Sequence, residues 1–186
     1  MTLPIYVYGS EMLRERAAGV DFSVSGVKEE ISALINDMNE TMRKADGVGL
    51  AAPQVGRLIR VLVVDGSPLD DMFPELRTFQ RAMINPVLLE ESKDGVEFNE
   101  GCLSIPDIHA DIVRPSTIKV SYTDENFNQV EETLSGFACR IVQHEMDHLD
   151  GVLFVDRAAP IRKKMLSGKL NSIKAGKVKT HYRTAL

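Results

Sequence analysis

The chain lacks the features of a secreted or membrane protein. Its 186 residues include only two cysteines, Cys102 and Cys139, too few for a disulfide framework. No window approaches about 18 uninterrupted apolar residues, which excludes a membrane-spanning helix and leaves no reason to expect a membrane partner. The N-terminus lacks the basic start and the apolar stretch of a signal peptide. We therefore expect a cytoplasmic protein, in a reducing compartment where thiols persist and can bind metal.

Acidic residues are absent from one end of the chain. Residues 157–186 contain nine Lys or Arg and no Asp or Glu, so the remainder has 13 basic and 27 acidic residues, although the net charge is only −5. A basic extension on an acidic body indicates an anionic partner, for which nucleic acid is the obvious kind, or else a segment that only keeps the chain in solution. The charge pattern does not decide between these two interpretations.

The remaining composition is that of a folded protein. Hydrophobic residues make up 44% of the chain and charged residues 26%, and the length suits one domain of ordinary size. We predict a single catalytic domain over residues 1–186, of which about 157–186 form the basic helical extension.

Hydrophobic periodicity predicts helices on both sides of a group of strands. Apolar residues over 27–42 recur at helical spacing behind Ser25, a suitable N-cap. FACRIVQHEMDHL (137–149) is a second helix, and a basic helix is expected over 162–173. The predicted strands are 59–65, 83–90, 117–124 and 129–134. This order favours an α+β fold, with mixed or antiparallel β-sheets packed around the central HExxH helix, an N-terminal helix and a C-terminal basic helix.

The segment HEMDH (144–148) carries the clearest chemistry in the chain. Its two histidines are four residues apart on a predicted helix, so they lie on one face, one turn apart, and can share a metal ion. Glu145 projects beside them, where its carboxylate can take a proton from a metal-bound water whose pKa the metal lowers to about 7. The segment therefore predicts a metal-dependent hydrolase with His144 and His148 as ligands and Glu145 as general base.

Two histidines leave a catalytic metal site one protein ligand short of the usual number. No glutamate follows Glu145, and the third histidine of the longer H-E-x-x-H-x-x-G-x-x-H pattern is replaced by Phe154, which cannot ligate. Asp150, Asp156 and His181 remain as donors downstream. Asp156 is the most credible of them, although it can equally cap a helix or pair with the basic tail.

A stronger third ligand lies upstream. Cys102 follows a glycine in EGCLSIP (100–106), a segment that we expect to be short and extended or turned. Its thiolate would complete a Cys-His-His site with one position open for water, and metal binding itself deprotonates the thiol. Cys139 is expected to be a small buried hydrophobic residue.

Three segments together resemble the motifs of bacterial-type peptide deformylases. They are GVGLAAPQVG (47–56), EGCLSIP (100–106) and QHEMDHLDG (143–151), and their order and separations also match the family. The likeness extends from about residue 3 to residue 165. HExxH alone is only moderately specific, whereas the three motifs in this order are highly specific.

The resemblance implies a reaction and a set of roles. The family removes the formyl group from the N-terminal methionine of newly made polypeptides. Its metal ligands match Cys102, His144 and His148. Glu145 matches the general base, which later delivers its proton to the departing amine, and Gln54 matches the glutamine that stabilises the oxyanion together with the backbone N–H at Leu103. Donors aimed at developing charge are each worth roughly 3–4 kcal/mol.

The resemblance also places the substrate. The residues expected to bind it are Val48, Gly49, Leu50, Phe98, Gly101, Phe137, Arg140 and Ile141. Segment 47–50 is the family's strand edge for backbone pairing with an extended nascent chain, and Val48, Phe98, Phe137 and Ile141 form the walls of the methionine pocket. Glycines 49 and 101 would leave room for substrate and metal. Arg140 either lays its stem along the pocket with its guanidinium in solvent, or points away.

The metal and the partners follow from the same resemblance. Imidazole and thiolate suit zinc, iron, cobalt or nickel, and the family points to one divalent ion, Fe²⁺ in the cell, for which Zn²⁺, Ni²⁺ or Co²⁺ can substitute. Iron beside a thiolate predicts oxygen sensitivity through oxidation of Cys102. The expected partners are N-formylmethionyl nascent peptides and, through the basic tail, the ribosome. We expect no DNA partner, and a monomer.

Two other functions are weighed against the deformylase. A metallopeptidase that cleaves internal peptide bonds would use the same HExxH chemistry, but neither a third histidine nor a downstream glutamate is present to complete its site. A family member that has lost catalysis would serve as a binding module. Loss of Glu145, Gln54 or Cys102 would mark such a protein, and all three are present.

Overall fold

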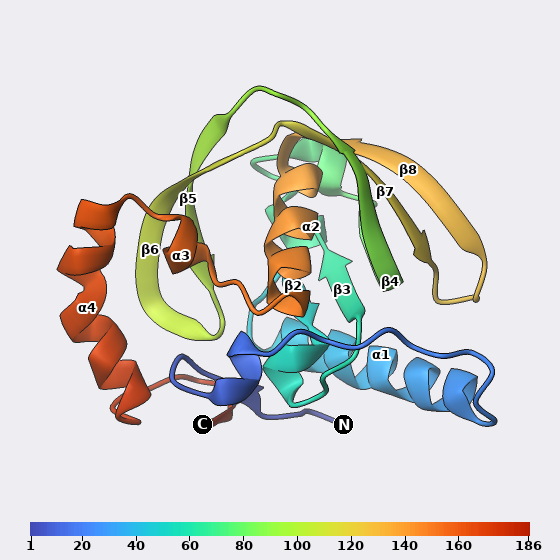
Figure 1. The fold of residues 1–186 in the computed structure, drawn as a ribbon, viewed down its shortest axis with the longest axis horizontal. Coiled ribbons are helices and arrows are strands. Elements are labelled where there is room, and N and C mark those ends of the chain that lie inside the picture. Colours follow the sequence, from blue (N-terminus) through green and yellow to red (C-terminus); the bar gives the residue numbers. More distant parts are fainter.

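The computed structural model describes residues 1–186 and has a five-stranded sheet at its centre (Figure 1). In spatial order, its strands are β2 (Gly49–Ala51), β3 (Val61–Asp65), β4 (Gln80–Glu91), β7 (Thr117–Thr123) and β8 (Gln129–Ser135). Every neighbouring pair is antiparallel. The α+β fold with antiparallel sheets is confirmed, and β2 lies at one edge of the sheet.

Opposite faces of this sheet are covered by two helices, α1 (Val27–Lys44) and α2 (Gly136–Leu149). Alternate residues of β3 point to each side. Leu62 and Val64 pack into the apolar cluster under α2, whereas Val61 and Val63 pack into the cluster under α1. Burial on both faces explains why this strand is a continuous apolar run in the sequence. The HExxH helix is α2, and it stands at the centre of the molecule (Figure 1).

A two-stranded antiparallel hairpin carries the cysteine of the second motif. It consists of β5 (Val96–Cys102) and β6 (Ile105–Arg114), and its register shifts between Glu100 and Cys102. The sequence predicts only a short extended or turned segment here. In β5 the one fully buried residue is the charged Glu100, so no alternation of apolar residues marks this strand.

The C-terminal part of the chain packs against this hairpin. α3 (Phe154–Arg157) and α4 (Pro160–Lys174) enclose a third apolar cluster together with the buried face of β6. Beyond α4, β9 (Thr184–Ala185) pairs in parallel with β1 (Ile5–Tyr6), so the two ends of the chain lie close together (Figure 1). Two-residue strands are too short for periodicity to reveal them.

The start of α1 differs from its prediction. Gly26, not Ser25, is the residue before the helix, with a φ of 79° and no side-chain cap. Glycine adopts this left-handed conformation at little cost, so the chain turns sharply into the helix. Short 3₁₀ helices complete the fold: η1 (Glu11–Arg14), η2 (Ala52–Val55), η3 (Ser67–Leu69) and η4 (Pro74–Leu76). None of the helices has both the length and the apolar character needed to cross a membrane.

Candidate active site

Cys102, at the end of β5, lies beside His144 and His148 on α2. One ligand atom of each residue lies within 4.8 Å of the other two, and the Cys102 Sγ is 3.3 Å from the His148 Nε2. The two imidazole rings are one helical turn apart, with centroids separated by 5.2 Å. The structure thus brings together the three residues that the sequence predicts as metal ligands.

This donor set fits a divalent metal. A thiolate and two imidazoles are the ligands that zinc and iron share in proteins. The His144 Nδ1 lies 3.0 Å from the Glu100 Oε2, which fixes the ring and leaves its Nε2 for a metal. Burial lowers the pKa of His148 well below its usual value, so this imidazole is neutral, the form that binds metal.

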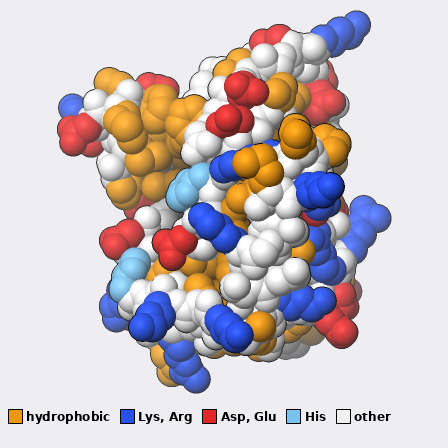
Figure 2. All heavy atoms as spheres, turned by 90° about the vertical axis from the view of Figure 1, so that its left-hand side faces the viewer, with side chains coloured by type: hydrophobic (Ala, Val, Ile, Leu, Met, Phe, Trp, Pro, Cys, Tyr) orange, Lys and Arg blue, Asp and Glu red, His pale blue; other side chains and the backbone are white.

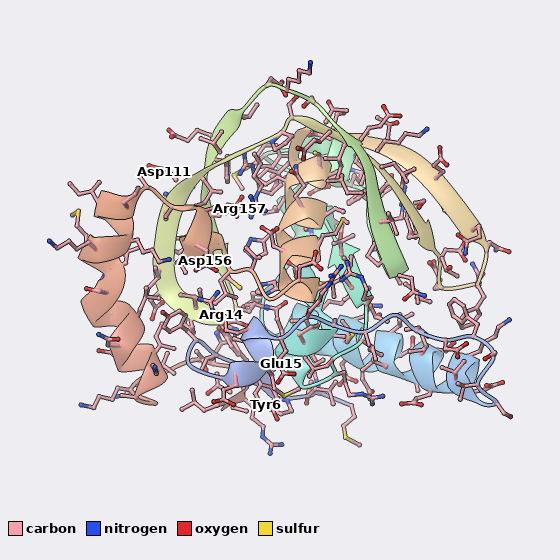
Figure 3. All side chains as sticks on the ribbon, viewed as in Figure 1. Tyr6, Arg14, Glu15, Asp111, Asp156 and Arg157 are labelled. Carbon is pink, nitrogen blue, oxygen red and sulfur yellow. The ribbon has the colours of Figure 1, made fainter.

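Asp156, the main alternative ligand, is occupied elsewhere. Its carboxylate pairs with Arg14 across η1 and α3 (Figure 3) and accepts a hydrogen bond of 2.9 Å from the backbone N–H of Leu153. Lys163 of the basic tail lies 3.4 Å from the same carboxylate. Asp156 therefore both caps α3 and pairs with the tail. This is the alternative that the sequence offers to a role as metal ligand.

The other downstream donors are also engaged away from the ligand group. Asp150 forms an ion pair of 2.8 Å with Arg60, and His181 lies 3.2 Å from Asp46. The upstream thiol of Cys102 is the donor that reaches the two histidines.

Glu100 is the acidic centre of a buried ion-pair network. Its carboxylate accepts hydrogen bonds from Arg114, at 2.6 and 3.0 Å, and from Arg140, at 2.6 Å. Arg114 also pairs with Asp147 at 2.8 Å. Burial alone would raise the pKa of the Glu100 carboxyl, but its hydrogen bonds with His144 and Arg114 hold that pKa well below its usual range. The sequence predicts no role for Glu100, because no linear pattern separates it from Glu97, the other acid of β5.

Arg140 differs from both of its predicted arrangements. Its side chain neither reaches solvent nor points away from the cavity: the residue is only 7% exposed. The guanidinium donates to Glu100, to the carbonyl of Ile112 at 3.1 Å and to the carbonyl of Val96. It also lies over the ring of Phe98, 5.6 Å from the centroid. A buried cation is tolerated here because the carboxylate of Glu100 compensates its charge.

Glu145 is buried beside the ligand group. One of its oxygens, Oε2, has no hydrogen-bond partner, and burial raises the pKa of the carboxyl to about 7. A Cβ at position 49 would overlap the Glu145 carboxylate. A Cβ at position 101 would come within 2.7 Å of the His109 ring. The two glycines thus make room for these two side chains, and their role in leaving room for substrate and metal stays a prediction.

Gln54 on η2 has its amide oriented by its neighbours. Its Oε1 accepts a hydrogen bond of 2.8 Å from the N–H of Ala51, while its Nε2 donates to the Ser104 Oγ at 3.1 Å and approaches the Cys102 Sγ at 3.5 Å. The backbone N–H of Leu103 has no hydrogen-bond partner. Two N–H donors, one from a side chain and one from the backbone, therefore lie next to the cysteine.

The motifs and their arrangement are shared with known proteins. A family model described as polypeptide deformylase matches residues 2–164. The chain belongs to the peptide deformylase family. Peptide deformylases of Salinibacter ruber and Christiangramia forsetii are 44% and 40% identical to it, over 98% of this chain and 93% and 95% of theirs. The crystal structure of the Thermotoga maritima enzyme is 41% identical, with a TM-score of 0.76, and covers 86% of this chain and 99% of that one.

The family assigns the activity. The chain is a hydrolase that removes the N-formyl group from newly made polypeptides, with a dependence on metal that is general in peptide deformylases. A metallopeptidase cleaving internal bonds is not favoured.

In this deformylase a cavity of about 890 Å³ opens beside Cys102 and His144. Its lining includes the predicted residues Val48, Gly49, Gln54, Phe98, Gly101, Cys102, Leu103, Phe137, Arg140, Ile141, His144 and Glu145. Leu50 is the one predicted substrate-binding residue outside the lining. Its side chain is fully buried in the cluster under α1, because successive residues of a strand point to opposite faces.

Segment 66–79 contributes a wall of the deformylase cavity that the sequence does not predict. Phe73 stacks on Phe137, with ring centroids 4.3 Å apart and planes within 9° of each other. Phe98 meets Phe137 edge-on at 4.8 Å. Other apolar residues of this segment that line the cavity are Leu69 and Met72. Glycine and prolines mark the segment as a loop, but they do not tell which part of the molecule the loop covers.

Proposed function

We propose that Cys102, His144 and His148 hold one divalent metal ion in this deformylase and that Glu145 is the general base. The observation that carries the proposal is the convergence of three donor atoms within 4.8 Å of one another, beside a buried carboxylate with an unpaired oxygen. When bound, a divalent ion supplies a water of lowered pKa and polarises the formyl carbonyl. The ion is Fe²⁺ in the cell, and Zn²⁺, Ni²⁺ or Co²⁺ can replace it, since thiolate and imidazole accept all four.

Glu145 moves the proton in both halves of the reaction. Its carboxylate takes a proton from the attacking water as the new C–O bond forms at the formyl carbon. It then delivers this proton to the methionine nitrogen as the C–N bond breaks, and formate and a free amine leave. The unpaired Oε2 is the atom available for this transfer.

Gln54 and Leu103 stabilise the negative charge that develops on the formyl oxygen. The Gln54 amide is held by the bond from Ala51 with its N–H₂ group toward Cys102, and the N–H of Leu103 has no competing partner. Such pre-oriented donors lose nothing to reorganisation during the reaction, and each is worth roughly 3–4 kcal/mol.

The methionine side chain lies in the apolar part of the cavity, and the walls that contact it are Val48, Phe98, Phe137 and Ile141. Beyond methionine, the nascent chain pairs with the free edge of β2. The Val48 carbonyl accepts a hydrogen bond of 2.9 Å from the N–H of Asp65. Because successive residues of an edge strand direct their backbone groups to opposite sides, the N–H and the carbonyl of Gly49 point to the open edge. Backbone pairing of this kind accepts any sequence.

The basic extension contacts the ribosome, where nascent chains emerge. On α4 the residues Arg162, Lys163 and Lys164 are exposed, next to Ile161 and Met165, which are 74% and 70% exposed. Figure 2 looks onto the side of the molecule where α4 lies and shows Lys and Arg side chains spread over it. Such a surface suits the phosphates of ribosomal RNA. The enzyme acts there as a cytoplasmic monomer.

Charge reversal tests this contact better than truncation, because the residues beyond α4 also line the cavity. The triple variant R162E/K164E/K169E should lose co-sedimentation with ribosomes at low salt while keeping its activity on a short peptide. Lys93→Glu, on the turn between β4 and β5, serves as the control. Equal ribosome binding by the triple variant would remove the proposal.

Release of formate from formyl-Met-Ala-Ser by anaerobically purified protein tests the catalytic assignment. Glu145→Gln should retain metal and lose activity, whereas Cys102→Ala should lose both and Cys139→Ala neither. Full activity of Glu145→Gln would overturn the role of the general base. Cleavage of denatured casein by the wild-type protein would instead favour a peptidase.

A further inference from the structure

The last ten residues of the chain return to the active site. Lys179, Thr180, His181 and Tyr182 line the cavity, on a segment that the sequence marks only as a basic tail. The Tyr182 hydroxyl donates a hydrogen bond of 2.8 Å to the carbonyl oxygen of Leu103, 79 positions away in the chain. Leu103 is the residue whose N–H is proposed above as an oxyanion donor.

The side chain and the carbonyl of Leu103 are held by neighbouring residues, whereas its N–H is free. Its side chain packs into the space left by Gly47, where a Cβ would come within 2.7 Å of the Leu103 Cδ1. Its carbonyl is held by Tyr182. The next residue, Ser104, directs its N–H to the Cys102 Sγ at 3.4 Å. Fixing these groups sets the direction of the remaining backbone N–H, which is free for substrate.

Tyr182 is itself anchored independently of Leu103. Its ring packs against the apolar cluster under α1, and its carbonyl accepts a hydrogen bond from the Thr180 hydroxyl. Segment 5–8, which begins with β1, joins the tail to the second motif, since the N–H of Ile5 donates to the Arg183 carbonyl at 2.9 Å and the N–H of Tyr8 donates to the Ser104 carbonyl at 2.8 Å. The tail and the segment of Leu103 therefore rest on the same N-terminal strand.

We propose that Tyr182 is a positioning residue for catalysis: its hydroxyl fixes the peptide unit of Leu103 so that the Leu103 N–H meets the formyl oxygen in the transition state. This proposal rests on the role proposed for the Leu103 N–H. It makes the C-terminal tail part of the catalytic apparatus. A hydrogen bond to the carbonyl of a donor residue acts on the transition state through geometry alone, without touching the substrate.

The test compares Tyr182→Phe with Tyr122→Phe in the metal-loaded enzyme. Tyr122, on β7, is a matched control. It is buried, its hydroxyl donates to Glu132 at 2.6 Å, and it lies outside the cavity lining. A displacement of about 1 Å can cost on the order of 100-fold in rate, so we expect Tyr182→Phe to lower kcat about tenfold, with KM for formyl-Met-Ala-Ser changed less than twofold. Tyr122→Phe should keep kcat even where it lowers the melting temperature.

A second measurement does not depend on activity. In ¹⁵N-leucine-labelled, zinc-loaded protein, Tyr182→Phe should shift the Leu103 amide resonance while Tyr122→Phe leaves it in place. An unchanged Leu103 resonance, or equal kcat in Tyr182→Phe and wild type, would overturn the positioning role. Gln54→Ala separates this result from the oxyanion proposal on which it rests: an impaired Gln54→Ala beside a fully active Tyr182→Phe would overturn only the role of Tyr182, whereas full activity of both variants would overturn the oxyanion proposal as well.

Discussion

Glu100 is the residue on which the buried charges of the site converge. It faces His144, a proposed metal ligand, on one side and two buried arginines on the other. A carboxylate in this position fixes the tautomer and orientation of His144 and makes it a better ligand. The same carboxylate allows Arg140 to line an otherwise apolar part of the cavity. One side chain therefore supports both the metal site and the substrate pocket.

Glu100→Gln should weaken the protein in two measurable ways. The amide keeps the size of the side chain but leaves Arg140 without a counter-charge and Arg114 with Asp147 alone, and removal of one partner from a buried pair costs about 3–5 kcal/mol. Metal affinity should fall roughly 10–100-fold because His144 loses its orienting carboxylate. Urea unfolding and chelator competition measure the two effects. Glu97→Gln, exposed on the same strand, should change neither, and a stable, tightly metallated Glu100→Gln protein would contradict the argument.

Gly49→Ala should remove activity without removing the fold. The three atoms nearest to the added Cβ are all side-chain atoms of Glu145, from its Cγ to its Oε1, so the chain folds while the proposed general base is displaced. We expect kcat to fall on the order of 100-fold. Gly168→Ala on α4 is the matched control, because nothing lies within 4 Å of its added Cβ; it should keep kcat and add about 0.5–1 kcal/mol of helix stability. Equal kcat in the two variants would show that Glu145 does not need the space.

At the scale of elements, segment 66–79 supplies an unpredicted wall of the methionine pocket. Phe73→Ala removes the ring stacked on Phe137. An aromatic pair is worth about 0.5–1.5 kcal/mol, so KM for formyl-Met-Ala-Ser should rise roughly 2–10-fold with little change in kcat. Phe22→Ala is the control, since its partner is Phe127, outside the cavity lining. An identical KM in both variants would place the methionine elsewhere.

The elements that could be predicted are those with a strong internal pattern. α2 and β3 have continuous or periodic apolar faces because each is buried against the core. The spacing of the two histidines on α2 was enough to predict two of the three residues of the Cys-His-His group. The β5–β6 hairpin could not be predicted because most of β5 is exposed, so no apolar alternation marks it. Its pairing with β6 depends on partners that no local pattern reveals.

Residue contacts between distant segments were harder to predict than elements. Arg140 has the ordinary properties of a surface residue, and only the fold shows that Glu100 lies opposite it. Phe73 and Tyr182 reach the cavity from a loop and from the tail, each placed by long-range packing. The family resemblance placed Phe98, Phe137 and Ile141 at the cavity, but it gave neither Phe73 nor Tyr182.

At the scale of the whole molecule, the ligands join two parts that otherwise have separate apolar clusters. His144 and His148 belong to α2, which packs on the five-stranded sheet, while Cys102 belongs to the hairpin that packs on α3 and α4. No disulfide joins the two parts; the ion pairs of Glu100 and Arg114 with α2 and the contact between Phe98 and Phe137 do. A metal bound by all three residues should therefore stabilise the contact between the two parts as well as activate water.

Metal removal should lower the melting temperature of the whole domain. A ligand that binds only the folded state at 100 times its Kd adds about 2.7 kcal/mol, and each kcal/mol shifts Tm by roughly 2–4 °C at this chain length. We therefore expect a chelator to lower Tm by about 5–11 °C in the wild-type protein. Cys102→Ala should show a low Tm that the chelator does not change, because no metal joins the hairpin to α2 in this variant. Cys139→Ala, which removes the buried thiol outside the ligand group, should respond to the chelator as the wild type does. A chelator effect of full size in Cys102→Ala would mean that the metal is held on α2 alone, and the hairpin would then owe its position to packing.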